Sequence, residues 1–218
     1  MKSIGNYNLF LFDFDGLLVN TEELHKVAYE EMLKRRGFTL AWNFATYATY
    51  AHKSTEALSN AVYDALPGLE SDEPEWNVLR QEKVAIYSDL IDQKIALMPG
   101  VKEFLEKIKD KKKVVVTNSP KDQVMKIQEK IPELSVIDAW VTRDDYTNAK
   151  PAPDGYLHAL TLFPHQKPIG FEDTEKGLNS LEAAGIEAVF IRPPNYPKTH
   201  TCKNTFSSFI DLLQSQDN

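Results

Sequence analysis

The sequence predicts an α/β protein: a parallel sheet with helices on both faces, interrupted by an inserted all-helical domain. Short apolar runs at residues 9–12 and 114–117 have the continuous hydrophobic character of strands that are buried on both faces. After residue 100, further runs of this kind alternate with amphipathic segments, which is typical of parallel strands joined by helical crossovers. Residues 18–97 carry helical periodicity alone, so they interrupt the α/β pattern.

Composition limits the size and the partners of the protein. With 218 residues, 42% of them hydrophobic, the chain can bury one core domain and one smaller domain. The net charge of −7 disfavours binding to nucleic acid or to an anionic membrane, because both require a basic surface. Cys202 is the single cysteine, which excludes an internal disulfide. No stretch resembles a membrane span or a signal peptide. We expect a cytoplasmic protein, and we expect it to be a monomer.

The helical insertion at residues 18–97 is expected to form a domain of its own, and residues 1–17 and 98–218 the α/β domain. Hydrophobic periodicity predicts three helices in the insertion, at about residues 20–37, 57–66 and 74–97. Residues 42–53 are aromatic and lack that periodicity, so we expect them to be irregular.

The α/β domain is expected to contain four further strands and several helices. The strands are predicted at residues 114–117, 139–142, 168–171 and 188–191. The helices are predicted at residues 101–109, from Pro120, near residues 154–163 and 176–184, and in a closing segment with Phe206, Phe209, Ile210 and Leu213.

Two carboxylates, Asp13 and Asp15, follow the first apolar run. A buried charge without a partner is costly, so a cation is expected to meet them, and a hard divalent cation suits carboxylate oxygens. Gly16 lets the backbone turn out of the sheet at this point. The alternative is an acidic surface turn or a fragment of a calcium site. The apolar run directly before Asp13 argues against it.

Three further polar stretches come at predicted strand ends. Thr117 and Asn118 follow three valines and offer a hydroxyl and backbone N–H groups to phosphate oxygens. Ser119 is expected to cap the next helix. Lys150 precedes a proline-rich turn, where a lysine is ordinarily a solvated surface residue. The pair of residues 172–173, Glu and Asp, ends the next apolar run, and an N-cap role alone could account for the aspartate.

Together these stretches resemble the four motifs of the haloacid dehalogenase-like (HAD) phosphohydrolases, in the β-phosphoglucomutase/phosphoglycolate phosphatase-like branch. The first motif of that family reads Asp-x-Asp-Gly-x-Leu-x-Asp-Thr, and Asn20 stands here where the family usually carries Asp. The later motifs are similar to Lys-Pro-x-Pro, beginning at Lys150, and to Glu-Asp-Ser/Thr-x-x-Gly, beginning at Glu172. The resemblance covers nearly the whole chain. It implies a Rossmann-like core with helices on both faces and an inserted helical cap domain.

The resemblance also implies a reaction. The protein is expected to be a Mg²⁺-dependent phosphatase of a small phosphorylated metabolite, such as a sugar or nucleoside phosphate, acting through an aspartyl-phosphate. Asp13 is the implied nucleophile, and Asp15 the implied acid and base. The implied Mg²⁺ ligands are Asp13, the backbone carbonyl of Asp15 and Asp173, with Glu172 in support through water. The groups implied to hold the phosphoryl oxygens are Thr117, the Asn118 N–H and Lys150.

Three residues of the insertion are expected to bind substrate: His25, His52 and Lys53. His25 matches a histidine that the β-phosphoglucomutase-like branch carries shortly after its first motif, although a lone helical histidine is also commonly a packed or solvated residue. His52 and Lys53 lie where that branch has Gly-x-Ser-Arg before a helix, and Ser54 occupies the arginine position. A serine hydroxyl is poorly suited to grip a distal phosphate, which weakens the case for a mutase.

Three alternatives remain beside the phosphatase. A phosphomutase is the nearest rival. A dehalogenase is disfavoured because that branch uses no metal and lacks the second aspartate, which is present here as Asp15. A phosphate-binding module without turnover is the alternative from a different class, and steady release of phosphate by the purified protein would exclude it.

Overall fold

The computed structural model describes residues 4–197 and 202–216, which form two compact units. The first unit contains the described residues up to Asn20, Ala96–Pro194 and the chain from Cys202 onward. The second contains Thr21–Ile95 together with residues 195–197.

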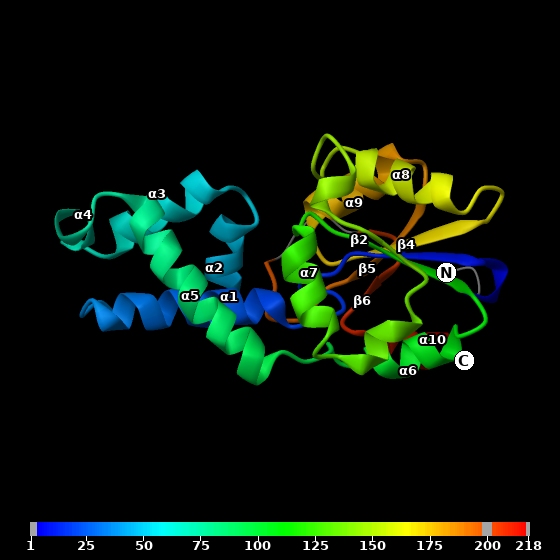
Figure 1. The fold of residues 1–218 in the computed structure, drawn as a ribbon, viewed down its shortest axis with the longest axis horizontal. Helices are drawn as coiled ribbons and strands as arrows, with labels where there is room; N and C mark the ends of the chain where they lie inside the picture. Colours follow the sequence, from blue (N-terminus) through cyan, green and yellow to red (C-terminus); the bar gives the residue numbers. More distant parts are fainter. Residues whose placement is uncertain (1–3, 198–201, 217–218) are drawn as a thin grey trace. The chain divides into compact units, whose positions relative to one another are not determined.

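The first unit is built on a six-stranded sheet in the order β3-β2-β1-β4-β5-β6 (Figure 1). All neighbouring strands are parallel, which confirms the predicted fold class. The strands are β1 (Leu9–Phe12), β2 (Lys112–Val116), β3 (Ala139–Val141), β4 (Pro168–Glu172), β5 (Glu187–Ile191) and β6 (Thr205–Phe206). The direction in which the chain adds strands reverses between β1 and β4, and ligands of open α/β sheets bind at such switch points.

The register aligns the carboxyl ends of the central strands. Phe12, the last residue of β1, pairs with Val115 of β2 and with Phe171 of β4. The chain therefore leaves all three strands at nearly the same level, and the side chains that follow them are neighbours in space.

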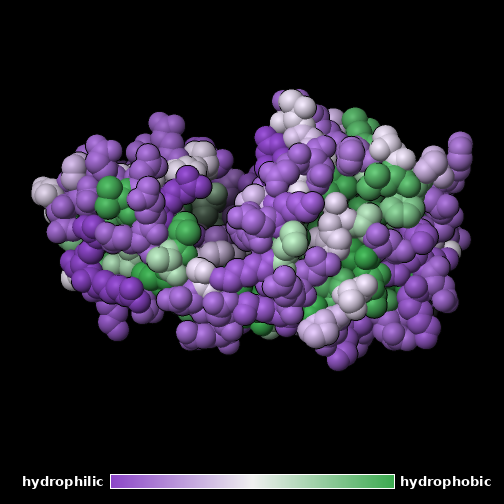
Figure 2. Space-filling view, in the orientation of Figure 1, coloured by the Kyte–Doolittle hydropathy of each residue, from purple (hydrophilic) through white to green (hydrophobic). Residues whose placement is uncertain are grey.

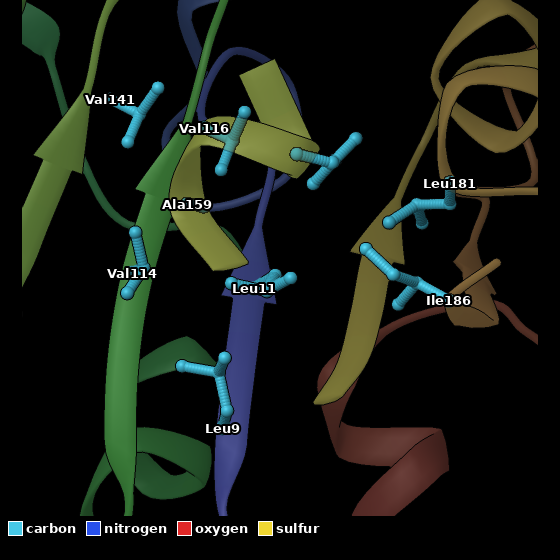
Figure 3. Packing of buried hydrophobic residues seen from close by; sticks show 9 residues of the cluster. Leu9, Leu11, Val114, Val116, Val141, Ala159, Leu181 and Ile186 are labelled. Atoms are coloured by element: carbon cyan, nitrogen blue, oxygen red, sulfur yellow. The ribbon is translucent and has the colours of Figure 1, made fainter. Parts of the chain in front are cut away.

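The two faces of β1 are buried in different layers. Leu9 and Leu11 belong to an aliphatic core with residues of β2, β3 and the helices α8 (Asp154–Leu162) and α9 (Glu175–Ala183) (Figure 3). Phe10 and Phe12 point to the other face, because successive strand residues alternate, and stack on Phe171 at 6.0 and 5.1 Å between ring centroids.

The helices α6 (Val101–Lys107) and α10 (Phe209–Gln216) cover this aromatic face, on the side of the sheet opposite α8 and α9 (Figure 1). The ring centroids of Phe104 in α6 and Phe209 in α10 lie 4.9 Å apart, and both rings contact Phe171. The remaining helical segments of this unit are η1 (Ile4–Asn6), α7 (Lys121–Gln128), η2 (Pro132–Val136) and η3 (Arg143–Asp145).

The second unit is helical throughout its regular structure. Its helices are α1 (Thr21–Arg35), α2 (Phe44–Ala51), α3 (Thr55–Ala65), α4 (Leu69–Asp72) and α5 (Trp76–Lys94). The three predicted helices are present as α1, α3 and α5, and α1 packs along α5.

The expectation that residues 42–53 are irregular is wrong, because most of this segment forms α2. The Oδ1 of Asn43 caps the helix by accepting from the Thr46 N–H at 2.9 Å, and the helix buries Tyr47 and Ala48. Aromatic and β-branched residues have modest helix propensity, so the cap and tertiary packing decide the conformation here.

The closing segment also differs from its prediction. Phe206 does not lie on the last helix; it pairs with Ile191 in the short edge strand β6, and the helix begins at Phe209. The Arg192 N–H donates to the Phe206 carbonyl at 2.8 Å. Two strand residues give too short an alternating pattern for the sequence to reveal.

The outer surface agrees with the charged composition. On the face drawn in Figure 2, hydrophilic side chains predominate, and hydrophobic ones gather in smaller patches. Of the helices that the structure describes, none combines the length and the apolar character needed to cross a membrane.

Candidate active site

Acidic and basic side chains meet at the carboxyl ends of β1, β2 and β4. Asp13 follows β1 directly and is held in register by its N–H, which donates to the Phe171 carbonyl at 3.0 Å. Thr117 follows β2, and Glu172 is the last residue of β4. Each residue is thus positioned by a buried strand rather than by a loop.

Lys150 is the centre of the cluster, with 7% of its surface exposed. Its ammonium donates to Asp13 Oδ1 at 2.5 Å, to Glu172 Oε1 at 2.7 Å and to the Val116 carbonyl at 2.7 Å. These acceptors use all three of its N–H groups. The expectation that such a lysine is ordinarily solvated does not hold at this position, which is followed by a cis peptide bond to Pro151.

Burial and charge set the proton affinities of this pair. Burial raises the pKa of Asp13 to about 8. The Lys150 ammonium opposes this shift, and the carboxylates of Glu172 and Asp15 add to it. Burial alone would lower the pKa of Lys150, but attraction to Asp13 and Glu172 outweighs it and raises that pKa above its ordinary value. Lys150 therefore stays charged at neutral pH.

Three carboxylates could hold a metal ion. Asp13, Glu172 and Asp173 each offer an oxygen, and these atoms lie within 4.8 Å of one another. Glu172 Oε2 is buried and has no hydrogen-bond partner among the residues that the structure describes. An oxygen-only donor set with an orphaned buried carboxylate oxygen fits a hard divalent cation.

The start of α9 closes over this acidic group. Thr174 caps the helix by accepting from the Gly177 N–H at 3.3 Å, so an N-cap role does not account for Asp173, which is only 2% exposed. A Cβ atom at Gly177 would lie 1.9 Å from Glu172 Oε2, closer than any real contact. Only glycine allows the helix backbone to approach the carboxylate this closely.

Asp15 is tied to the loop after β2. Its Oδ2 accepts from Ser119 Oγ at 2.6 Å and from Thr117 Oγ1 at 3.1 Å, and Thr117 Oγ1 accepts in turn from the Ser119 N–H. The prediction that Ser119 caps the next helix is wrong: α7 has Pro120 at its N-cap and no side-chain cap bond. The Ser119 hydroxyl donates to the Asp15 carboxyl instead of accepting from an amide of the helix.

Two tyrosines of the site were not recognised from the sequence. The Tyr156 hydroxyl donates to Glu172 Oε1, and the Lys150 ammonium lies 4.9 Å from the centre of its ring. The Tyr146 hydroxyl lies 2.8 Å from Asn118 Oδ1. A tyrosine on the inward face of a helix needs a polar partner, so Tyr156 could have been found as an inward-facing tyrosine of the helix predicted near residues 154–163. No comparable signal marks Tyr146.

The predicted substrate-binding residues of the insertion lie in the second unit. His52 Nε2 is 3.2 Å from Glu22 Oε2, and Lys53 is exposed. The His25 ring stacks on Tyr87 with 3.9 Å between centroids. Ser54 Oγ caps α3 by accepting from an amide of its first turn. The role of these residues toward substrate stays a prediction.

Lys83 of α5 is an unexpected partner of His25. It is buried, its ammonium contacts His25 Nδ1, and it lies 5.1 and 4.8 Å from the ring centres of Tyr29 and Tyr87. Desolvation lowers the pKa of Lys83 to about 8, and desolvation together with the Lys83 charge lowers the pKa of His25 to about 3. The sequence offers no signal that distinguishes Lys83 from the exposed lysines of an amphipathic helix.

Two curated proteins are similar to this chain in sequence over most of its length. Protein CbbY of Rhodobacter capsulatus is 27% identical over 196 residues, which cover 86% of each chain. The phosphorylated carbohydrates phosphatase of Thermotoga maritima is 27% identical over 190 residues, covering 83% of this chain and 82% of that protein.

Solved structures share the fold over almost the whole chain. The crystal structure of a predicted phosphoglycolate phosphatase from Haemophilus somnus superposes with a TM-score of 0.74 at 20% identity and covers 97% of this chain and 99% of that one. CbbY from Rhodobacter sphaeroides, solved in complex with phosphate, gives a TM-score of 0.70 at 23% identity, covering 97% and 100%. Residues 10–191 match the haloacid dehalogenase-like hydrolase family. The chain belongs to that family of hydrolases.

Proposed function

We propose that this protein is a Mg²⁺-dependent phosphatase that hydrolyses a small phosphorylated metabolite, a sugar or nucleoside phosphate, through an aspartyl-phosphate on Asp13. One observation carries the proposal: the buried cluster in which the Lys150 ammonium bridges Asp13 and Glu172 beside Asp173. Hydrolysis of a phosphomonoester through an aspartyl-phosphate needs a carboxylate nucleophile, and a cation site and a fixed positive charge stabilise the transferred group; this cluster offers all three.

The relatives support a phosphorylated small molecule as substrate. They include the phosphorylated carbohydrates phosphatase mentioned above, a fructose-1-phosphate phosphatase of Escherichia coli and a probable pseudouridine-5′-phosphatase of Drosophila melanogaster. The second and third of these are 27% identical to this chain over 192 and 220 residues. Sugar and nucleoside phosphates are therefore the two classes to test first.

Mg²⁺ would be held by Asp13, Asp173 and the backbone carbonyl of Asp15, with Glu172 in support. A divalent cation bound there supplies charge neutralisation at the phosphoryl oxygens. The protein side chains supply the rest. The Asn118 N–H would donate to a phosphoryl oxygen. Lys150 and Thr117 would each exchange one of their present acceptors within the cluster for a phosphoryl oxygen, and so orient the group toward Asp13.

Two displacements at phosphorus complete the reaction. A carboxylate oxygen of Asp13 attacks, the bond to the alcohol oxygen breaks, and Asp15 gives its proton to that leaving oxygen. Asp15 then takes a proton from a water molecule, which attacks phosphorus and releases inorganic phosphate and the Asp13 carboxylate. The hydrogen bonds from Thr117 and Ser119 hold the Asp15 carboxyl beside this path.

Release of inorganic phosphate from a panel of sugar phosphates and nucleoside monophosphates tests the proposal. We expect steady turnover in Mg²⁺ and none in excess chelator, because three converging carboxylates repel one another without a cation. Full activity in chelator would contradict the metal requirement. Binding of phosphate without any release would support the binding-module alternative instead.

The phosphomutase alternative is less well supported. Ser54, at the position of the arginine in the mutase-like branch, already uses its hydroxyl to cap α3. A forked guanidinium grips a phosphate with two parallel hydrogen bonds, which a capping serine does not replace. His52 and Lys53 are the remaining polar groups of that segment.

A further inference from the structure

We propose that Tyr146 is a positioning residue that orients the Thr117–Asn118 peptide group for phosphoryl binding. This inference rests on the proposed function, in which the Asn118 N–H holds a phosphoryl oxygen. It assigns to Tyr146 the task of fixing the direction in which that N–H points.

The Tyr146 hydroxyl contacts the other end of the same peptide group. It lies 2.8 Å from the Thr117 carbonyl oxygen. This peptide bond is trans, and the C=O and N–H of a trans peptide point in opposite directions. A carbonyl held by Tyr146 therefore directs the Asn118 N–H away from the tyrosine. That N–H donates to no atom of the described residues, so it is available to a ligand.

The same hydroxyl is linked to the lysine loop. Tyr146 Oη lies 2.8 Å from Asn118 Oδ1, which also accepts from the Lys150 N–H at 3.0 Å. The hydroxyl has one proton to donate and two acceptors within reach. Tyr146 thus contacts Thr117 and Asn118 directly, and it is linked to Lys150 through the Asn118 side chain.

The ring of Tyr146 is held in place from two sides. Arg143 donates to the Tyr146 carbonyl at 2.7 Å, and its guanidinium carbon lies 5.4 Å from the ring centre. The Arg143 N–H donates to the Ser119 carbonyl at 3.0 Å. On the other side, a Cβ at Gly155 would lie 3.1 Å from Tyr146 Cε1, so glycine makes room for the ring. Burial raises the pKa of Tyr146 to about 12, which keeps the hydroxyl protonated at neutral pH.

Loss of the hydroxyl should affect turnover more than substrate capture. A hydrogen bond to the carbonyl also polarises the N–H of the same peptide group, which strengthens its bond to the phosphoryl oxygen as negative charge develops. We expect Tyr146→Phe to lower kcat by about tenfold to a hundredfold, as small misplacements of positioning groups do, and to change KM by less than about threefold.

Tyr7→Phe is the matched control. The Tyr7 ring is buried, and its hydroxyl donates to the exposed carboxylate of Glu187, the first residue of β5, at the end of the sheet opposite the site. Both variants lose one tyrosine hydroxyl and its hydrogen bonding, and their melting temperatures report how much each loss costs in stability. With p-nitrophenyl phosphate and Mg²⁺, kcat of Tyr7→Phe should stay within about twofold of wild type. A Tyr146→Phe enzyme that also stays within twofold would overturn the inference.

Binding of inorganic phosphate provides a second readout. In ¹H–¹⁵N spectra of the Mg²⁺-loaded protein, we expect phosphate to shift the Asn118 amide resonance downfield, and to shift it much less in Tyr146→Phe. Equal shifts in both proteins would contradict the inference. If Tyr146→Phe does not fold, Gly155→Ala crowds the ring while keeping the hydroxyl, because the new Cβ would lie 3.1 Å from Tyr146 Cε1 and 3.0 Å from Val116 Cγ1. An unchanged kcat in a Gly155→Ala protein whose Asn118 amide resonance has moved would also overturn the inference. A wild-type protein that releases no phosphate would overturn the proposed function itself.

Discussion

Replacing Lys150 by alanine tests the centre of the site. The ammonium satisfies two buried carboxylates, at 2.5 Å from Asp13 and 2.7 Å from Glu172. The substitution removes the fixed positive charge proposed to face the phosphoryl group. It also leaves the buried carboxyl groups of Asp13 and Glu172 without the ammonium that bridges them.

The expected effects are large. Removing one preorganised donor from a site of developing negative charge costs about a hundredfold to a thousandfold in kcat. Breaking a buried ion pair by removing one partner costs about 3–5 kcal/mol of stability. For a chain of this length, each kcal/mol corresponds to about 2–4 °C, so the metal-free variant should melt about 10 °C lower.

The assay compares Lys150→Ala with Lys111→Ala, a lysine of the turn before β2 whose side chain takes no part in the cluster. Phosphate release gives kcat, and thermal unfolding with and without Mg²⁺ gives the stability. Because a bound cation replaces part of the lost charge, Mg²⁺ should raise the melting temperature of Lys150→Ala more than that of wild type. Turnover of Lys150→Ala within tenfold of wild type, or equal losses in both variants, would refute the assigned role of this lysine.

Four further predictions concern the nucleophile, the helical unit and the phosphomutase alternative. Asp13→Asn should reduce turnover below about 1% of wild type, in line with the loss of a nucleophile. In metal-free buffer this variant should melt no lower than wild type. The pKa of Asp13 is raised to about 8, so ionisation of this carboxyl lowers the stability of the folded state as the pH rises, and the neutral amide avoids that cost. A clearly lower melting temperature of the variant would contradict this reasoning. His25, with its pKa lowered to about 3, should make the folded state less stable as the pH falls below 6.5, by up to about 5 kcal/mol at pH 3. Urea unfolding of wild type and His25→Gln between pH 7 and 4 should show a shallower pH dependence in the variant, and parallel curves would contradict this. Lys53→Ala should change KM among substrates more than metal dependence. An unchanged substrate ranking in that variant would contradict the role assigned to Lys53. The wild type should not interconvert glucose 1-phosphate and glucose 6-phosphate with a bisphosphate primer, and efficient primed isomerisation would count against the phosphatase proposal.

The sequence predicts the central strands because each is marked by neighbouring residues: an apolar run followed directly by a polar one. In β1, four apolar residues end abruptly at Asp13, and this contrast is visible without any knowledge of the fold. The strand ends that carry Thr117 and Glu172 are marked by the same contrast. Parallel pairing then places these ends side by side, so the sequence order of the motifs was enough to predict the family and the general position of the site.

Other features depend on partners that are distant in the sequence. Ser119 looks like a helix cap, and only the proximity of Asp15, more than a hundred residues earlier, makes its hydroxyl part of the site. Tyr146 contacts the Thr117 carbonyl although 29 residues separate them in the sequence, and no periodic pattern connects the two loops. The helix α2 escaped prediction because its stability comes from the Asn43 cap and the burial of Tyr47 rather than from propensity.

Gly177 is a position of the site at which substitutions should be poorly tolerated. It has no functional group, yet even the methyl group of alanine would occupy the position of Glu172 Oε2, only 1.9 Å away. Alanine normally stabilises the interior of a helix relative to glycine, so a redesign guided by helix propensity alone would select it here. The methyl group would then displace the buried Glu172 carboxylate from Lys150 and Tyr156. Selection for activity should therefore retain this glycine as strictly as it retains the carboxylates.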